Sequence, residues 1–500
     1  MPNIVAYAVL YGYPLLAYFI FRSLTPARAV IWTILIGYLL LPPVPTVANF
    51  PILPTLSKIE IPSLSAALLL VWFHGLKSLC WPKNRILIAL GMVYVLSPFA
   101  TILLNSDVIV TGYFSVQPLS FRDIPSTILG KLFFLLPGIL AYSVLSKPGH
   151  LKDILLALVI ATGFYSVPML LEIRLSPQIN TWVYGFFQHD FAQMIRGSSF
   201  RPIVFLYHAL WVAFLVLSTA IAATALYRYS DKDLPMEGGQ RDFLIHPLVI
   251  LAPLTRKNPH ALYFWLALYF TVLLFLCRSY GSIIYGMALI PFAAMASPRL
   301  QLFGAFGLAV IVATYPITRM MGMFPTEELV DVARQINEAR AHSLEFRFNN
   351  EQILLERAQE RMLFGWGTWG RNMPINPFTG AYLTISDGRW IITLGQFGIV
   401  GFVAEFGLFL MPIVTAFYYN MKGGMAGISP YIPAFALLMG INAVDMLPNA
   451  TVTPLTFLFV GAMMRHLDGV PERRAQQRRF VENRMVTYLP RPIEGPRTIL

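Results

Sequence analysis

Several arginines lie at the ends of long apolar segments, where their side chains could bind an anion. Arg201, Arg278 and Arg319 each stand at an end of such a segment, and Arg389 stands just before another. The guanidinium group is planar, stays charged and can hold a phosphate through two hydrogen bonds. Charge near the interior of a bilayer is costly and tends to face a cavity, a partner or a ligand. These arginines therefore predict a site for a phosphate-bearing ligand.

Other ionisable residues fall at a similar depth. Lys131 and His208 are predicted about two helical turns inside their spans, and Asp445 lies near the end of another. Arg201 and His208 are seven positions apart, which predicts that they share one face of a helix. An arginine at the end of a span is more often an anchor to the headgroups than a ligand, and pairing inside the protein explains the other three equally well. The clustering at one depth favours a functional site.

The composition indicates a membrane protein with many spans. Of 500 residues, 56% are apolar and 12% are charged, whereas soluble proteins have about 25% charged residues. An ordinary soluble enzyme, a disordered chain and a fibrous protein are excluded. The net charge of +12 is explained by cytoplasmic loops and anionic lipids or phosphates, so no nucleic acid is expected. Cys80 and Cys277 have no partners at metal-ligand spacing, so no metal site is expected.

Apolar segments long enough to cross a bilayer recur along the whole chain. A spanning helix needs about 20 apolar residues, and we predict an all-α bundle of about 13 spans, within a range of roughly 12–14. The segments are 4–21, 29–48, 63–80, 86–104, 124–145, 153–171, 201–227, 259–277, 281–296, 300–318, 391–419, 430–447 and 453–465. The predicted parts are spans one to ten in 1–318, a large loop with two helices in 319–390, spans eleven to thirteen in 391–466, and a basic tail in 467–500.

The distribution of Lys and Arg orients this chain. Most of the 37 Lys and Arg residues fall on the inner side if the N-terminus lies outside, in agreement with the positive-inside rule. The loop 319–390 is then outside, and the tail is cytoplasmic. The segment 228–258 is predicted to be an irregular inner loop. The tail arginines are expected to contact lipid headgroups or solvent.

Four short segments between about 196 and 405 form an ordered set of motifs. They are Arg196-Gly197-Ser198-Ser199-Phe200-Arg201-Pro202 before a span with His208, Arg278-Ser279-Tyr280-Gly281-Ser282, Ser343-Leu344-Glu345-Phe346-Arg347 followed by a helix and Leu363-Phe364-Gly365-Trp366-Gly367, and Asp387 followed by Leu394-Gly395-Gln396-Phe397-Gly398-Ile399-Val400-Gly401. In order and spacing this set resembles the O-antigen ligase and polymerase family of bacterial membrane glycosyltransferases.

The resemblance implies a GT-C-like helical enzyme of the bacterial inner membrane. Such enzymes take a glycan from undecaprenyl diphosphate on the periplasmic side, and the resemblance marks Arg196, Arg201, Arg278 and Arg347 as contacts to the diphosphate or the glycan. Asp387 matches the position of the catalytic polar residue of the ligases, which is commonly a histidine. This departure favours a polymerase of exopolysaccharide or O-antigen over a ligase that transfers glycan to lipid A core.

In the mechanism expected from this resemblance, arginines stabilise the departing diphosphate and a carboxylate accepts the proton of the acceptor hydroxyl. The predicted catalytic residues are Asp387, Glu345, Arg278 and Arg347, and the predicted substrate-binding residues are Arg196, Arg201, His208, Arg319, Arg389 and Lys131. Neither a metal nor another cofactor is required. Four aromatic residues could stack on sugars or, equally well, belong to an interfacial aromatic belt: Trp366, Trp369, Tyr382 and Trp390.

Two functions from other classes stay open. A polysaccharide flippase or other transporter would show repeated halves around a site at the bilayer midplane, and the sequence shows no such repeat. A structural subunit of an envelope assembly would need no arginine cluster. The expected partners are the lipid-linked glycan, the lipid bilayer, a flippase and a chain-length regulator.

Overall fold

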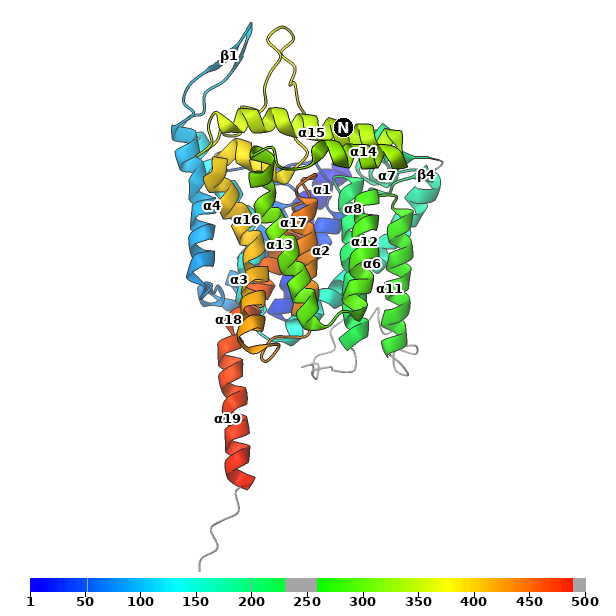
Figure 1. Cartoon of the computed structure of the whole chain (residues 1–500), viewed down its shortest axis with the longest axis vertical. Helices are drawn as coiled ribbons and strands as arrows, with labels where there is room; N and C mark the ends of the chain where they lie inside the picture. Colours follow the sequence, from blue (N-terminus) through cyan, green and yellow to red (C-terminus); the bar gives the residue numbers. More distant parts are fainter. Residues whose placement is uncertain (52, 198, 230–258, 489–500) are drawn as a thin grey trace, which may run out of the picture.

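The protein is a bundle of helices, with a few short strands at one end (Figure 1). The computed structural model describes all residues except 52, 198, 230–258 and 489–500. Most of the predicted inner loop 228–258 and the last part of the predicted tail therefore lie outside the described residues.

The bundle helices follow the predicted apolar segments. They are α1 (Ile4–Ser23), α2 (Pro26–Leu40), α3 (Glu60–His74), α4 (Arg85–Leu103), α5 (Asp123–Val144), α6 (Gly149–Leu175), α8 (Ala209–Tyr229), α11 (Pro259–Leu276), α12 (Tyr280–Met295), α13 (Pro298–Met320), α16 (Arg389–Gly423), α17 (Ile432–Asp445) and α18 (Pro454–Asp468). Each predicted segment overlaps one of these helices, which confirms the helical class, although 29–48, 63–80 and 201–227 extend beyond their helices.

Seven of the described helices are long and apolar enough to cross a membrane, and the protein is a membrane protein. These are α1, α4, α5, α6, α8, α13 and α16. Helices α2, α3, α11, α12 and α17 are apolar but shorter. A crossing by about 13 helices stays a prediction, because several of the segments fold into helices shorter than the roughly 20 residues that a full span needs.

The remaining elements lie at the two ends of the bundle. They are α7 (Ile179–Tyr184), α14 (Thr326–Ile336), α15 (Glu338–Gln359), α19 (Val470–Tyr488), the 3-10 turns η1 (Leu76–Ser78) and η2 (Phe191–Met194), the hairpin β1 (Ile109–Thr111) with β2 (Phe114–Val116), and the hairpin β3 (Ile195–Arg196) with β4 (Ser199–Phe200). Helices α14 and α15 lie across one end, which we call the loop end, and α19 projects from the opposite, tail end (Figure 1). The N-terminus lies at the loop end.

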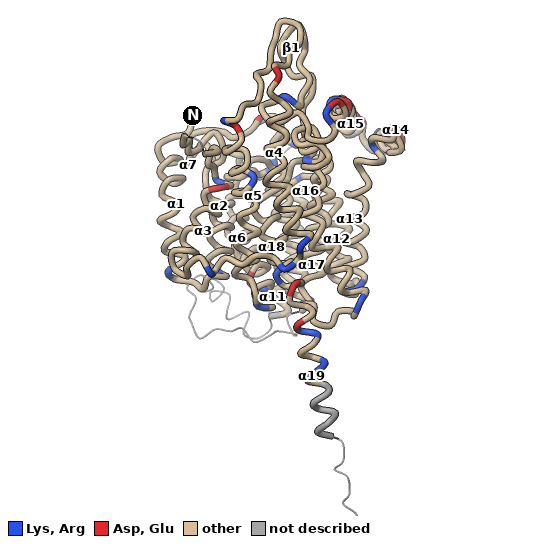
Figure 2. Tube along the Cα trace, turned by 90° about the vertical axis from the view of Figure 1, so that its left-hand side faces the viewer, with Lys and Arg blue, Asp and Glu red and all other residues tan. Residues whose placement is uncertain are grey.

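Charged residues gather mostly towards these two ends, as Figure 2 shows. The middle of the bundle is apolar and is organised around α8. In this helix, 89% of an apolar stretch of 18 residues is buried. Its run Ser218–Ala225 contains only small residues and one isoleucine, which lets neighbouring helices approach closely. The hydroxyl groups of Thr162 on α6 and Thr219 on α8 share a hydrogen bond of 2.8 Å across this contact.

Helices α5 and α18 cross with their backbones in close contact at two glycines. A Cβ atom added at Gly461 would lie 2.0 Å from the carbonyl oxygen of Gly138. A Cβ atom at Gly138 would in turn lie 3.0 Å from the carbonyl oxygen of Phe457. Only glycine at position 461 permits this crossing without a shift of one helix.

We expect Gly461→Ala to lower the free energy of unfolding by about 1–3 kcal/mol, because the new methyl group overpacks a tight contact. Thermal unfolding in detergent measures this. The matched control is Gly307→Ala on α13, where nothing lies within 4 Å of an added Cβ and alanine favours the helix. Equal melting temperatures for the two variants would contradict the tight crossing.

Candidate functional site

The segment between β4 and α8 is a non-helical turn that carries two of the predicted site residues. The structure begins α8 after His208, so the prediction that Arg201 and His208 share a helix face is wrong. The carboxylate of Glu172 on α6 accepts the backbone N–H groups of Ile203 and Val204, both at 2.8 Å. Val204 in this turn has a φ of 49°, which a right-handed helix does not allow, so the span starts later.

Further buried groups hold this turn in place. Glu172 also accepts the N–H of Ile179 at 3.1 Å, and the ammonium group of Lys58 donates to the carbonyl of Phe205 at 2.6 Å. Both Glu172 and Lys58 are fully buried. The sequence analysis missed both residues, although a lone carboxylate at the end of a long apolar segment was a visible signal.

Three of the predicted arginines meet where the β3–β4 hairpin touches the turn between α11 and α12. Arg201 is buried, and its guanidinium donates to the hydroxyl of Ser279 at 2.7 Å. Arg278 donates from Nη1 to the backbone carbonyl of Arg196. Arg278 has a φ of 50°, so the turn holds it in a conformation that non-glycine residues rarely adopt. The structure therefore brings together the first two motifs of the sequence.

Arg347 on α15 adds a fourth cation from the loop. Its Nε lies 3.8 Å from Oδ2 of Asp387, with side chains 37% and 44% exposed. It is also close enough to interact electrostatically with His208 and Asp445. Partial burial raises the pKa of Asp387, and Arg347 opposes that rise. Residues from four separate parts of the sequence thus surround one site, whose positive charge suits an anion and whose carboxylate could accept a proton.

His208 is a neutral member of this site. Burial, followed by electrostatic interactions with His189 and Arg201, lowers the pKa of His208 to about 3. Its Nδ1 accepts the N–H of Leu210 at 2.9 Å, which assigns the proton to Nε2, 3.4 Å from Oε1 of Gln193. At physiological pH the side chain can donate one hydrogen bond to a ligand, but it carries no charge.

Asp445 forms the base of the site beneath Arg347. It is buried and accepts hydrogen bonds from Thr451 at 2.6 Å and Asn449 at 3.0 Å. The hydroxyl of Tyr285 on α12 also hydrogen-bonds it. These bonds connect the end of α17 to α12 and leave Asp445 in a supporting position.

Arg389 and Lys131 belong to a separate, buried network. Arg389 Nε lies 2.6 Å and Lys131 Nζ 3.6 Å from the carboxylate of Glu405, which is fully buried on α16. Lys131 also lies over the rings of Tyr94 and Phe397, at 4.2 and 3.9 Å from their centres. The structure therefore places these two predicted substrate-binding residues against one shared buried carboxylate, which compensates part of their charge.

Arg319 braces α15 against the bundle. Its Nε lies 2.6 Å from Glu351 on α15, whose carboxylate also accepts from Tyr315 at 2.9 Å and from the indole of Trp390 at 3.1 Å. Glu351 is four residues beyond Arg347 and therefore on the same helix face. This brace connects α13, α15 and α16, and it positions Arg347 over the site.

Glu345, the second predicted base, lies towards α14. It is about half exposed, and its carboxylate lies 3.9 Å from Arg334 of α14. Of the two predicted bases, Asp387 is the one whose carboxylate contacts a site arginine.

The motif around Trp366 packs on the start of α16. The N–H groups of Trp366 and Gly367 donate to the carbonyls of Gly395 and Gln396, at 2.8 and 2.9 Å. Gly398 has a φ of 65° inside α16, and a Cβ atom there would lie 2.3 Å from the carbonyl oxygen of Leu363. The last two motifs of the sequence are thus paired backbone to backbone, which fixes the loop that holds Asp387.

No family model and no curated protein matches this chain. The interpretation of the site therefore depends on its own geometry and on the motifs of the sequence.

Glu405→Gln should destabilise the protein by about 3–5 kcal/mol, because Arg389 and Lys131 would stay buried without a counter-charge. Chemical unfolding of the purified protein in detergent measures the change. Asp387→Asn is the matched control, since its carboxylate is 44% exposed, and we expect a change within about 1 kcal/mol. A Glu405→Gln variant as stable as the control would contradict the structural assignment of Arg389 and Lys131.

Proposed function

We propose that this protein is a GT-C-like polysaccharide polymerase of a bacterial inner membrane that joins undecaprenyl-diphosphate-linked repeat units on the periplasmic side. The observation that carries the proposal is the grouping of Arg196, Arg201 and Arg278 near His208 at the loop end, with Arg347 close to both His208 and Asp387. Cations outnumber carboxylates there, as the binding of a lipid diphosphate requires.

In the proposed reaction the arginines hold the diphosphate of the donor. The acceptor hydroxyl oxygen attacks the anomeric carbon of the donor sugar, and its proton passes to Asp387. The bond from that carbon to the diphosphate oxygen breaks, and the diphosphate leaves as an anion stabilised by Arg201, Arg278 and Arg347. The neutral His208 can donate to a ligand oxygen. The chain's own residues thus supply both the proton acceptor and the stabilisation of the leaving group.

The orientation follows from this proposal: the loop end faces the periplasm and the tail end the cytoplasm. Arg473 and Arg474 of α19 donate to backbone carbonyls of the loop after α16, including Gly427 and Ala426, both at 2.8 Å. They thus anchor the tail helix in addition to any contact with lipid headgroups. A flippase that delivers lipid-linked repeat units and a chain-length regulator are the proposed partners.

The direct test is the purified protein in liposomes with undecaprenyl-diphosphate-linked repeat units. We expect a ladder of extended glycans, and we expect Arg347→Gln and Asp387→Asn to lower the extension rate about 100-fold or more, as the loss of a positioned proton acceptor or leaving-group contact does. Arg334→Gln and Asp331→Asn remove matched charges from α14 and should extend at the wild-type rate. Movement of the substrate without a new glycosidic bond would indicate a transporter, and a single transfer to lipid A core would indicate a ligase; either would overturn the proposal.

The rate of extension should fall at acid pH as Asp387 becomes protonated. Because Arg347 opposes the rise of the Asp387 pKa, Arg347→Gln should raise this pKa further and move the acid limb of the residual activity to higher pH. Arg347→Lys keeps the positive charge and should leave the limb closer to its wild-type position. A pH–rate profile of the three proteins measures this, and an unmoved limb in Arg347→Gln would count against Asp387 as the proton acceptor.

A further inference from the structure

A polar cavity lies at the loop end, between the β1–β2 hairpin and the last turns of α15. Its volume is about 330 Å³, within the range of small-molecule sites. Lining residues that matter here are Thr111 from the hairpin, Ile353, Glu356, Arg357 and Glu360 from α15, and Arg371 from the following loop. None of them belongs to the site of Arg196, Arg201, Arg278, Arg347 and Asp387, which we call the arginine site.

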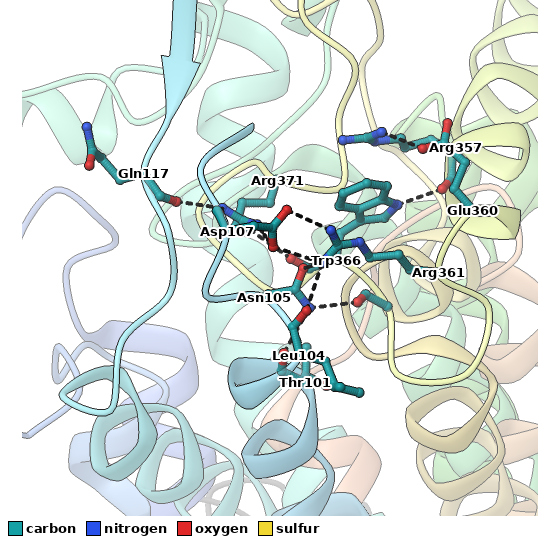
Figure 3. A network of polar contacts seen from close by, with 11 residues as sticks. Thr101, Leu104, Asn105, Asp107, Gln117, Arg357, Glu360, Arg361, Trp366 and Arg371 are labelled. Carbon is teal, nitrogen blue, oxygen red and sulfur yellow. Dashed lines mark hydrogen bonds and ion pairs between the residues drawn. The ribbon is translucent and has the colours of Figure 1, made fainter. Parts of the chain in front are cut away.

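The wall of this cavity is held rigidly (Figure 3). The guanidinium groups of Arg357 and Arg361 lie 3.3 and 4.1 Å from the ring centre of Trp366. Asp107 joins Arg361 at 2.7 Å and Arg371 at 3.4 Å, and Arg361 holds the pKa of Asp107 below its usual value. Arg371 is almost fully buried. The cavity is therefore formed before any ligand arrives.

The charges around the cavity are balanced. Arg357 pairs with Glu360 at 2.6 Å, and Asp107 compensates Arg361 and Arg371. Glu356 adds a further carboxylate that accepts from Gln352 at 3.1 Å. A diphosphate would meet carboxylates here, which disfavours it. Carboxylates and guanidinium groups side by side instead suit the hydroxyl groups of a sugar, which both donate and accept.

Two exposed aromatic rings lie further along the segments that line the cavity. Tyr113 at the tip of the β1–β2 hairpin is 91% exposed, and Phe378 in the loop after Arg371 is 81% exposed. The two tips touch, because a Cβ atom at Gly112 would lie 2.3 Å from the carbonyl oxygen of Pro377. Exposed rings of this size on paired hairpins indicate a binding surface, and their faces are suited to stack on sugar rings.

We infer that this cavity binds saccharide units of the glycan, separately from the lipid diphosphate. The inference rests on the proposed function, and it assigns the two parts of the substrate to two sites on one helix. Arg347 and Arg357 are ten residues apart on α15, about 15 Å along its axis, which a chain of a few sugar rings can span. A glycan held here would stay on the protein between additions.

The test is the binding of fluorescently labelled oligosaccharides, released from the surface polysaccharide of the source cells, to the full-length protein in detergent. We expect wild-type protein to bind them, Glu356→Gln to raise Kd about tenfold through loss of a charge-assisted hydrogen bond, and Ile353→Trp to abolish binding by filling the cavity. Glu338→Gln on α15 and Val332→Trp on α14 are matched exposed controls and should bind as wild type.

A variant of the arginine site separates a failure of this inference from a failure of the proposed function. Arg347→Gln should bind free oligosaccharide as wild type does, although it fails in extension. Equal affinity of wild type, Glu356→Gln and Ile353→Trp, or no binding by wild type, would overturn the inference. Loss of binding in Arg347→Gln alone would place the sugar at the arginine site and overturn it too. Binding as expected without a ladder of products would instead refute the polymerase and leave the saccharide site standing.

Discussion

A charge buried in an apolar helical bundle must find a counter-charge or a full set of hydrogen bonds, and this constraint organises the loop end. Three buried carboxylates meet it in different ways. Glu405 pairs with both Arg389 and Lys131, Glu351 fixes α15 through Arg319, and Glu172 accepts backbone N–H groups of the turn before α8. Together they hold in place the helices and turns that carry Arg201, Arg278 and Arg347.

Cations that pair with these buried carboxylates support the fold, whereas the arginines of the site can face a ligand. Arg347 lies 3.8 Å from the half-exposed Asp387 and interacts electrostatically with the buried Asp445, and Arg201 and Arg278 donate to a hydroxyl and a backbone carbonyl. The four arginines of this site therefore outnumber the two carboxylates named beside them. That excess, under a helix that the buried Glu351 keeps in position, is the physical reason to propose an anionic lipid-linked substrate.

The sequence predicted the helices and the convergence of the arginine motifs, because apolar length and the cost of membrane-level charge are local properties. It could not predict which cations pair with a buried carboxylate, since Glu405 is 16 residues from Arg389 and far from Lys131 in the sequence. The turn at 201–208 was missed because its cause, Glu172, lies on another helix. The saccharide cavity was missed because it forms only where the β1–β2 hairpin meets α15.

The central claim is that the arginines of the loop end bind a lipid diphosphate. Its most direct measurement is photocrosslinking with an undecaprenyl-diphosphate-linked repeat unit that carries a diazirine in the lipid next to the diphosphate, followed by peptide mapping. The account predicts crosslinks to 196–208, 278–282 and 343–351, and their loss in Arg347→Gln. Crosslinks confined to the tail end, or unchanged in Arg347→Gln, would contradict it.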